Sequence, residues 1–474
     1  MPKRQRRCSE MLFSSLVFLT VFLPMVLFLY FFAPVQAKNH VLLIASIIFY
    51  SWGEPVYLFL MLFSAAFNYY MGLEIDSRSG KLRKTSLAFA VLVNLFILGF
   101  FKYFGFFMDT IGDLIGSEVS YTALPLPIGI SFYTFQAMSY IIDVYRHTAR
   151  VQRDFFRFAL YLCLFPQLIA GPIVKYRDIE SQLDRRPIHL QSMGEGSARF
   201  ILGLAKKVIL ANALGDLHQQ ILTMDQEGGP TSVLLFWLGA VAYMLQIYFD
   251  FSGYSDMAIG LGRIFGFRFM ENFQYPYISR SVTEFWRRWH ISLSTWFLEY
   301  LYIPLGGNRV RTLRHIFNLL LVWTLTGLWH GASWNFVLWG VYYGLLLVLE
   351  KYVWGKGLEK LPACFQRLYA LLVVLLGWVL FFSADLGSAI HYLTCLFGGG
   401  QVVVYNDTFL YLLKENLVLL LGAIAFCHPA TYRTFQRITK RWSVLGIVVL
   451  LAVFVLCLAF LISTSYNPFL YFRF

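Results

Sequence analysis

Residues 316–350 read IFNLLLVWTLTGLWHGASWNFVLWGVYYGLLLVLE, and this stretch decides the fold class of the chain. Two apolar runs, 316–328 and 333–350, flank the short element Trp329-His330-Gly331. Basic residues stand outside both runs: Arg309, Arg311 and Arg314 before the first, and Lys351, Lys356 and Lys360 after the second. Because short loops rich in Lys and Arg stay on the cytoplasmic side of a membrane, both outer ends are expected there. The stretch therefore predicts a hairpin that enters a membrane and returns.

The composition agrees with a membrane protein. Of the 474 residues, 58% are hydrophobic and only 14% are charged, whereas a soluble domain carries about 25% charged residues. Apolar runs of membrane-spanning length, roughly 18–25 residues, recur along the whole chain. The sequence predicts an all-α polytopic membrane protein.

About eleven transmembrane helices are expected, with one or two shorter segments that are re-entrant or interfacial. The chain shows no soluble segment and no long linker, so residues 1–474 are predicted to form a single integral membrane domain. It shows no internal repeat either, which disfavours a secondary transporter. Candidate spans lie near 12–32, 40–70, 86–108, 127–145, 155–171, 197–215, 231–250, 312–328, 333–350, 367–383, 408–427 and 443–463, and Gly53-Glu54-Pro55 divides the second of them.

The net charge of +13 is explained by Lys and Arg in cytoplasmic loops and by contact with anionic membrane lipids. The basic residues lie in short loops between spans, so no nucleic-acid partner is expected. The six cysteines have no metal-ligand spacing, which predicts neither a disulfide framework nor a metal site; they are Cys8, Cys163, Cys364, Cys395, Cys427 and Cys457. Residues 1–10 are basic and precede the first apolar run. They indicate a retained first helix, although Met11 could equally be the natural start.

His330 is the first candidate functional residue. The apolar arm before it has about 13 residues and so reaches roughly 20 Å as a helix, against a hydrocarbon core of about 30 Å. His330 is therefore expected inside the membrane, where irregular backbone must be buried in protein or line a cavity. There it could remove a proton from a hydroxyl that attacks an acyl group, and Gly331 would let a substrate approach closely. Hydrogen-bond donors to an oxyanion are available in Ser333, Asn335 and the indoles of Trp329 and Trp334. The alternative is a structural histidine bonded to a backbone carbonyl.

His290 is the second candidate, in a polar and aromatic stretch over residues 266–311. Val282 to Leu301 has the composition of a charged, interfacial or partly buried helix, on which Trp286, Trp289 and Leu293 would share one face. One interpretation makes His290, with Arg287, Arg288 and Glu284, a basic patch on lipid phosphates. The other makes it a second wall of the His330 cavity, where Arg287 and Arg288 bind a phosphate of the acyl donor.

Two aspartates near Phe251-Ser252-Gly253-Tyr254-Ser255 leave their roles open. Asp256 is expected to cap a helix or to pair with Arg263. Either Asp250 or Asp256 could instead orient a catalytic histidine.

Several motifs together resemble the membrane-bound O-acyltransferase family, over nearly the whole chain. They are closest to its branch of membrane subunits for alginate and peptidoglycan O-acetylation. The motifs are Leu126–Gln136, Gln167–Pro172, Asp250–Gly260, Glu271-Asn272-Phe273, Phe285–Trp296, Tyr302–Arg309, Leu328–Gly331 and the ending Tyr471-Phe472-Arg473-Phe474.

The resemblance implies that His330 is the catalytic histidine and His290 a second essential one, in helices around a central tunnel. It implies an O-acyltransferase, most simply an O-acetyltransferase, in the inner (cytoplasmic) membrane. The donor would be acetyl-CoA or another thioester on the cytoplasmic side, with no bound cofactor. The acceptor would be an extracytoplasmic cell-envelope polysaccharide, reached with an extracytoplasmic acetyltransferase or esterase-like partner. Two alternatives stay open: D-alanyl transfer from a carrier protein to teichoic acid, which residues 302–309 disfavour, and an acyl-group channel without chemistry.

Overall fold

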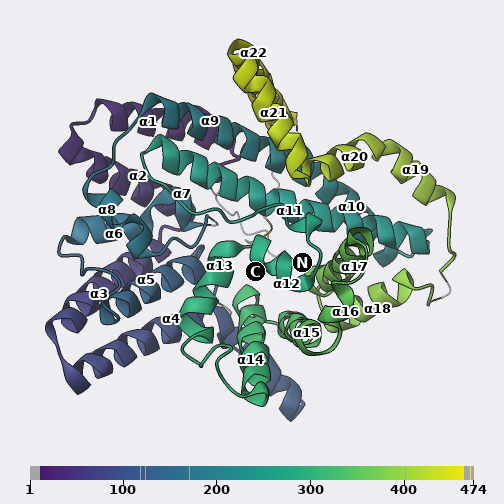
Figure 1. The fold of residues 1–474 in the computed structure, drawn as a ribbon, viewed down its shortest axis with the longest axis horizontal. Helices are drawn as coiled ribbons and strands as arrows, with labels where there is room; N and C mark the ends of the chain where they lie inside the picture. Colours follow the sequence, from purple (N-terminus) through teal and green to yellow (C-terminus); the bar gives the residue numbers. More distant parts are fainter. Residues whose placement is uncertain are drawn as a thin grey trace. The chain divides into compact units, whose positions relative to one another are not determined.

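The described part of the chain is helical throughout. The computed structural model describes residues 11–463 except 118, 123, 170 and 401, together with Leu470. Within these residues the regular elements are helices (Figure 1), and one isolated bridge joins Ser232 to Val403. The predicted all-α fold is confirmed. The basic segment 1–10 with Cys8, Ala170 of its motif and the ending 471–474 lie outside the described residues.

The residues group into two compact units that interleave along the chain. Unit 1 comprises residues 1–200, 254–270 and 461–463, and unit 2 comprises 201–253, 271–460 and 464–474. The long helix α11 (Val233–Ile264) contributes to both. The single domain expected over residues 1–474 stays a prediction.

Unit 1 begins with helices that the sequence places where expected, with one exception. Glu54 and Pro55 separate α2 from α3, as predicted. The expected span 155–171 is wrong as one helix, because the chain breaks at Leu164 and restarts with Pro166 in the first turn of α7, a position that suits proline. The helices are α1 (Leu23–Phe32), α2 (Lys38–Gly53), α3 (Tyr57–Ser77), α4 (Gly80–Ile115), α5 (Ile130–Tyr145), α6 (Phe155–Cys163), α7 (Phe165–Leu168), α8 (Tyr176–Asp184) and the first part of α9 (Leu190–Ala205).

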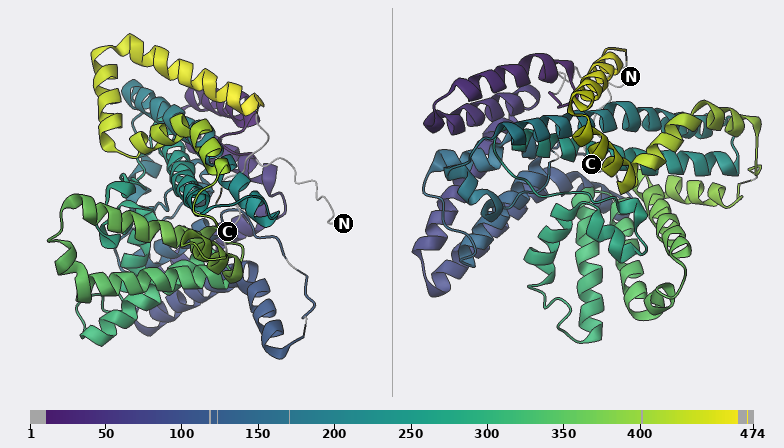
Figure 2. Two further views of the ribbon diagram at one scale, coloured as in Figure 1. Left: turned by 90° about the vertical axis from the view of Figure 1, so that its right-hand side faces the viewer. Right: turned by 45° about the horizontal axis from the view of Figure 1, so that its top comes forward.

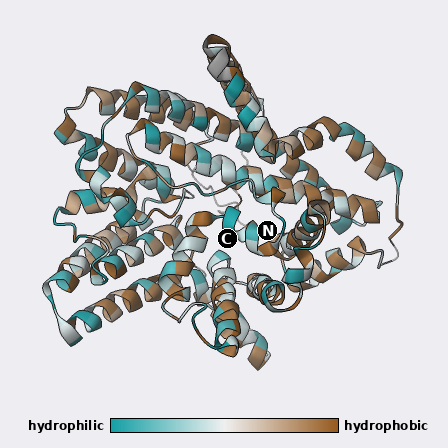
Figure 3. Ribbon diagram, viewed as in Figure 1, coloured by the Kyte–Doolittle hydropathy of each residue, from teal (hydrophilic) through white to brown (hydrophobic). Residues whose placement is uncertain are grey.

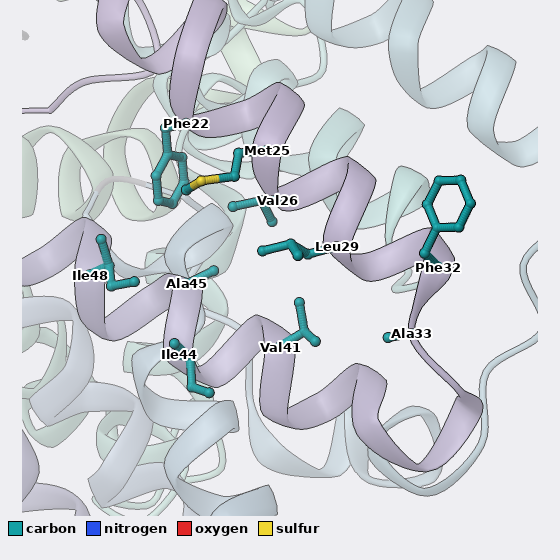
Figure 4. Close-up of a pocket in the computed structure, with 10 residues that line it drawn as sticks. All are labelled: Phe22, Met25, Val26, Leu29, Phe32, Ala33, Val41, Ile44, Ala45 and Ile48. Atoms are coloured by element: carbon teal, nitrogen blue, oxygen red, sulfur yellow. The ribbon is translucent and has the colours of Figure 1, made fainter.

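An apolar groove of about 390 Å³ lies between α1 and α2 of unit 1. Figure 4 shows the side chains that line it, which include Phe22 just before α1, Met25 and Leu29 from α1, and Ile44 and Ile48 from α2. Every lining side chain is hydrophobic. The groove therefore offers no group that could hold or transfer a proton.

Unit 2 holds both candidate histidines. Its helices are α10 (Asn212–Gln226), α12 (Val282–Arg288), α13 (Ile291–Phe297), α14 (Thr312–His330), α15 (Trp334–Leu349), α16 (Gly355–Leu358), α17 (Ala363–Phe382), α18 (Leu386–Leu396), α19 (Asp407–Glu415), α20 (Leu417–Phe426), α21 (Pro429–Arg441) and most of α22 (Ser443–Ser463). Wider π-type turns extend some of them: η3 (Lys206–Ala211) before α10, η5 (Leu298–Tyr302) after α13 and η6 (Glu350–Trp354) after α15.

The predicted hairpin is present, and small residues bring its two arms together. Helices α14 and α15 run side by side (Figures 1 and 2). A Cβ atom on Gly327 would lie 2.1 Å from the carbonyl oxygen of Phe336, and one on Gly340 would lie 2.3 Å from that of Trp323. Only glycine allows this approach of two backbones, which is typical of membrane helix pairs.

Six described helices are long and apolar enough to cross a membrane: α3, α4, α11, the continuous α15–α16 stretch, α17 and residues 444–463 of α22. A seventh span results if α19 and α20, bent by 59°, count as one. Figure 3 shows hydrophobic residues along the helices of both units, with hydrophilic residues among them. The chain is thus a multi-pass membrane protein, and the expected count of about eleven crossings stays a prediction, since shorter helices such as α2 and α5 are not among the six.

Candidate functional site

A sharp break in the chain positions His290. The sequence predicted one helix over Val282–Leu301, and this is wrong: α12 ends at Arg288, α13 starts at Ile291, and His290 has a left-handed backbone with φ 43° and ψ 53°. The break turns both Trp289 and His290 into the protein, where they are 1% and 2% exposed. Trp286, Trp289 and Leu293 are buried, but they do not form the face of a single helix.

The aromatic face of α12 fixes it against the hairpin. The ring of Trp286 lies 4.7 Å from that of Trp323 on α14, and 5.4 and 4.8 Å from those of Trp339 and Tyr343 on α15, between ring centres. Such edge-to-face aromatic pairs add about 0.5–1.5 kcal/mol each beyond the burial of their area. This packing sets where His290 lies relative to α14.

His330 is the last residue of α14, next to the turn as predicted. Its imidazole packs among rings from three helices, with centre-to-centre distances of 5.1 Å to Trp329, 5.1 Å to Trp339 and 5.4 Å to Phe381. A Cβ atom on Gly331 would lie 2.1 Å from the ring of Phe336. The expectation that Gly331 makes room for a substrate is therefore corrected: Phe336 occupies that space.

The two imidazoles meet in one cavity. Their ring centres are 6.4 Å apart, and both side chains line a cavity of about 960 Å³ within unit 2. The shared cavity agrees with the prediction that His290 is not an anchor on the membrane surface. It brings together residues about forty positions apart in the sequence.

The cavity extends along α14 from His330 back to His315. Fifteen residues of helix correspond to about 22 Å. At the His315 level the lining is basic, because Lys351 lies beside His315, and Arg287 and Lys356 line the same cavity. By the charge rule for membrane loops, this end is expected on the cytoplasmic side, which stays a prediction.

His315 is held by two tyrosines, and sequence reasoning missed this group. The Tyr302 hydroxyl lies 2.7 Å from Nε2 of His315, and the Tyr352 hydroxyl lies 2.7 Å from its Nδ1. Lys351 Nζ approaches Nε2 at 3.3 Å. Tyr302 opens a motif noted in the sequence, but nothing there paired it with a histidine thirteen residues away.

The predicted binding residues divide into those on the cavity and those elsewhere. Arg287 lines the cavity, whereas Arg288 is bound to Glu284 (Nη2–Oε1 2.8 Å) and to the carbonyl of Gln274 (3.0 Å). Trp329 contacts both imidazole rings, at 5.9 Å from His290 and 5.1 Å from His330.

The remaining predicted binding residues belong to the start of α15. Ser333 is the residue just before that helix, and the Nδ2 atom of Asn335 donates to the carbonyl of Ser383 at 2.9 Å. Trp334 is 54% exposed. In the described part of the chain the cavity lining includes none of these three, so the structure does not place them as oxyanion donors there.

Two further residues complete the site, and sequence reasoning gave neither of them a role. The buried Glu350 accepts hydrogen bonds from the backbone amides of Val282 and Thr283, at 2.6 and 2.9 Å. Asn272 is bonded to the His290 imidazole through its side-chain oxygen, at 3.2 Å from Nδ1. Asn272 stood in a motif and Glu350 ended a span, but only the folded chain brings them to α12 and His290.

The electrostatic surroundings favour a neutral His290. This residue lies between α12 and α13, outside the spanning helices, and burial lowers the pKa of its imidazole to about 3.

Asp250 pairs with Lys207, and both are nearly fully buried, with Nζ–Oδ1 at 2.5 Å. Asp256 pairs with Arg199 at 2.8 Å rather than with Arg263 as expected, and Arg263 pairs with Glu195 at 3.1 Å.

The chemistry open to this site is proton transfer by imidazole. Among the described residues, no group of three or more His, Cys, Asp or Glu side chains could hold a metal ion. The five described cysteines carry free thiols. Two histidines on the wall of one cavity suit the removal of a proton from a hydroxyl and its later return to a leaving group.

Comparison with known proteins shows to which family the chain belongs. The sequence pattern of the membrane-bound O-acyltransferase family matches residues 146–384, which include both histidines. The chain is similar to a probable alginate O-acetylase of Azotobacter vinelandii, with 44% identity over 82% of this chain and 79% of the relative. It is similar to a peptidoglycan O-acetyltransferase of Helicobacter pylori, with 31% identity over 99% of this chain and 98% of the relative.

A more distant similarity reaches a teichoic acid D-alanyltransferase of Bacillus subtilis, with 27% identity over 50% of this chain and 62% of that protein. The predicted family resemblance is confirmed. The chain belongs to the membrane-bound O-acyltransferase family, as a multi-pass membrane enzyme that transfers acyl groups to oxygen.

Proposed function

We propose that this enzyme takes an acetyl group from a cytoplasmic thioester, acetyl-CoA, and passes it towards hydroxyls of an extracytoplasmic cell-envelope polysaccharide. Its place would be the inner membrane. The observation that carries the proposal is one cavity with His290 and His330 at one level and Lys351, beside His315, at the other. The names of the two relatives similar over most of the chain support acetyl as the acyl group and alginate or peptidoglycan as the class of acceptor.

The dimensions of the cavity suit a long donor. A thioester that reaches His330 from the His315 level must extend about 22 Å. A carbonyl at the end of a flexible arm meets this requirement, and the phosphates of its head would remain near Arg287 and Lys351. Arginine binds phosphate through two parallel hydrogen bonds, so Arg287 is the first candidate for that contact.

The proposed reaction uses His330 as the base. Its imidazole removes the proton of an acceptor hydroxyl as the oxygen attacks the thioester carbonyl. The carbon–sulfur bond of the tetrahedral intermediate then breaks, and the imidazolium returns its proton to the departing thiolate. A positioned base of this kind contributes about 10²–10⁴-fold to the rate.

An extracytoplasmic partner completes the proposal. The acceptor polysaccharide is outside the membrane, whereas His330 is expected inside it. An acetyltransferase or esterase-like protein on that side would therefore receive the acetyl group, or present the acceptor hydroxyl, and place it on the polymer.

The test uses the purified full-length enzyme in lipid vesicles with radiolabelled donors. Labelled acetyl-CoA, supplied with the partner protein and polysaccharide, is expected to label the polymer, and His330→Ala is expected to prevent this. Labelling only from a D-alanyl carrier protein would replace the proposal with the D-alanyl reaction. Acetyl groups that cross the vesicle membrane as intact thioester would point to a channel without chemistry.

A further inference from the structure

The side-chain oxygen of Asn272 gathers three hydrogen-bond donors from the break that carries His290. It accepts from the backbone amide of Ser292 at 3.2 Å and from the Ser292 hydroxyl at 2.9 Å, and it lies 3.2 Å from Nδ1 of His290. Asn272 is 1% exposed. A buried carbonyl oxygen on which three polar groups converge is a built contact, because buried polar groups are stable only when they are hydrogen-bonded.

The backbone of the same segment holds both ends of the break. The amide of Ile291 donates to the carbonyl of Asn272 at 3.0 Å, and the amide of Gln274 donates to the carbonyl of Arg288 at 2.9 Å. A left-handed backbone is unfavourable for a non-glycine residue such as His290 and persists only where the surroundings determine it. Residues 272–274 therefore fix the backbone from which the imidazole projects.

The pattern of donors assigns the tautomer of His290. A backbone N–H can only donate, so the Asn272 atom that meets the Ser292 amide is the oxygen and not the nitrogen. That oxygen can only accept from the ring, so the proton of a neutral imidazole is on Nδ1. Nε2 then carries the lone pair and is the acceptor of the ring.

We propose that Asn272 is a positioning residue that holds His290 as its Nδ1–H tautomer, so that Nε2 accepts a hydrogen bond from the acceptor hydroxyl beside His330. The proposal rests on the acyl transfer proposed above and adds a division of labour to it. His290 orients the hydroxyl, and His330 removes its proton. In the other tautomer the proton would be on Nε2. That N–H could only donate to the hydroxyl oxygen, and the hydroxyl proton would then not be oriented by His290.

The groups around His290 decide how the protonation of its imidazole responds to a new charge. Phe251 of α11 and Trp329 of α14 face the imidazole as rings, at 4.7 and 5.9 Å between centres. The titratable group that faces it is His330, at 6.4 Å, and Arg287 of α12 lines the same cavity. A new negative charge at position 272 would be in direct hydrogen-bond contact with Nδ1–H.

The decisive variant is Asn272→Asp. A carboxylate keeps an acceptor for all three donors and stabilises the protonated imidazole, which raises the pKa of His290. His290 can accept a hydrogen bond at Nε2 only while neutral, so activity is lost as pH falls through that pKa. The acidic limb of kcat against pH is expected to move upward by at least one pH unit, with activity retained at alkaline pH. Gln220→Glu, which adds the same charge at an exposed position of α10, is expected to leave the profile unchanged.

A second measurement does not depend on activity. Nitrogen NMR of the full-length protein with labelled histidine, assigned by the signal lost in His290→Gln, is expected to show a protonated Nδ1 and an unprotonated Nε2. Asn272→Leu is expected to abolish this preference while His330 keeps its signals. A wild-type spectrum with Nδ1 unprotonated, or an Asn272→Asp profile identical to that of the wild type, would overturn the proposal. If the NMR result holds but acetyl transfer is absent from the wild type, the tautomer stands and the proposed function fails.

Discussion

The carboxylate of Glu350 accepts hydrogen bonds from both the backbone amide and the hydroxyl of Thr283, at 2.9 and 2.7 Å. Its other oxygen accepts from the amide of Val282 at 2.6 Å. Glu350 belongs to the helix that returns from the hairpin, whereas Val282 and Thr283 begin α12. This buried carboxylate therefore ties the helix before His290 to the hairpin that carries His330.

Glu350→Ala is expected to lower both stability and acyl transfer. Three donors lose their acceptor, and each buried, unsatisfied donor costs about 1–3 kcal/mol. Thr283→Val removes only the hydroxyl and should show a smaller loss of the same kind. Melting temperature in detergent and the rate of acyl transfer measure the effect, with the exposed Glu415→Ala as the matched control. A Glu350→Ala enzyme with wild-type values of both would disprove the role of this contact.

The adjacent residues Arg287 and Arg288 are expected to differ in their effect on donor binding. Arg287→Ala is expected to raise the KM for the donor about 10–100-fold, because a charge-assisted hydrogen bond contributes about 1.5–3 kcal/mol, with little change in melting temperature. Arg288→Ala should leave that KM near normal, since Arg288 is bound to Glu284. Steady-state kinetics of the two variants, measured side by side, decide between them. Equal effects on KM would refute the assignment of Arg287 alone.

The hairpin could be predicted, and an expected depth for His330 could be derived, because the signals for both are local. Charge at both ends, two apolar runs and a histidine at the turn are all contained in one continuous stretch of sequence. Chain length converts directly into depth in the membrane through the helical rise. No contact with distant residues was needed for either conclusion.

The break at His290 could not be predicted, because distant residues create it. Helix propensity favours continuation through Val282–Leu301, and no glycine or proline interrupts that stretch. Hydrogen bonds from residues 272–274 and the burial of Trp289 override this preference. Arg287 and Arg288 both lie on α12, and only the packing of that helix decides that Arg287 lines the cavity and Arg288 does not. A distant residue also decides the role of Asn335, which the sequence offered as an oxyanion donor. Its side-chain amide instead donates a hydrogen bond to the carbonyl of Ser383, far along the chain.

Gly331→Ala tests the structural reason for glycine after His330. The added methyl would overlap the ring of Phe336 at 2.1 Å, and overpacking of this kind costs about 1–3 kcal/mol. The double variant Gly331→Ala/Phe336→Leu should recover part of the lost melting temperature. Gly357→Ala, where a Cβ meets nothing within 4 Å, is the matched control. If Gly331→Ala keeps full stability but loses donor binding, then glycine serves the substrate after all.

The orientation of the cavity can be tested by labelling single cysteines in cells. Lys351→Cys, on a background without other reactive thiols, should resist a membrane-impermeant reagent added outside and react after the membrane is opened. The reason is the basic residues at that end, which the charge rule assigns to the cytoplasm. Position 386, which starts α18 beyond the far end of α17, should react from outside. Strong labelling at position 351 in intact cells would reverse the orientation and with it the side of the donor.

Replacement of His330 tests the chemistry directly. His330→Ala should reduce acyl transfer by about 10²–10⁴-fold, which is the contribution of a positioned base. Abundance in the membrane should fall much less, since Trp339 remains in contact with Phe381 and with Trp286 of α12. His189→Ala, at an exposed position, controls for the loss of a histidine as such. Donor binding to the purified His330→Ala enzyme should be near normal, because Lys351, one of the contacts expected to hold the donor head, lies beside His315, about 22 Å from His330 along α14. If the His330→Ala enzyme still transfers acetyl groups at close to the wild-type rate, His330 is not the base. His290 would then be the imidazole at that end of the cavity that could take the proton.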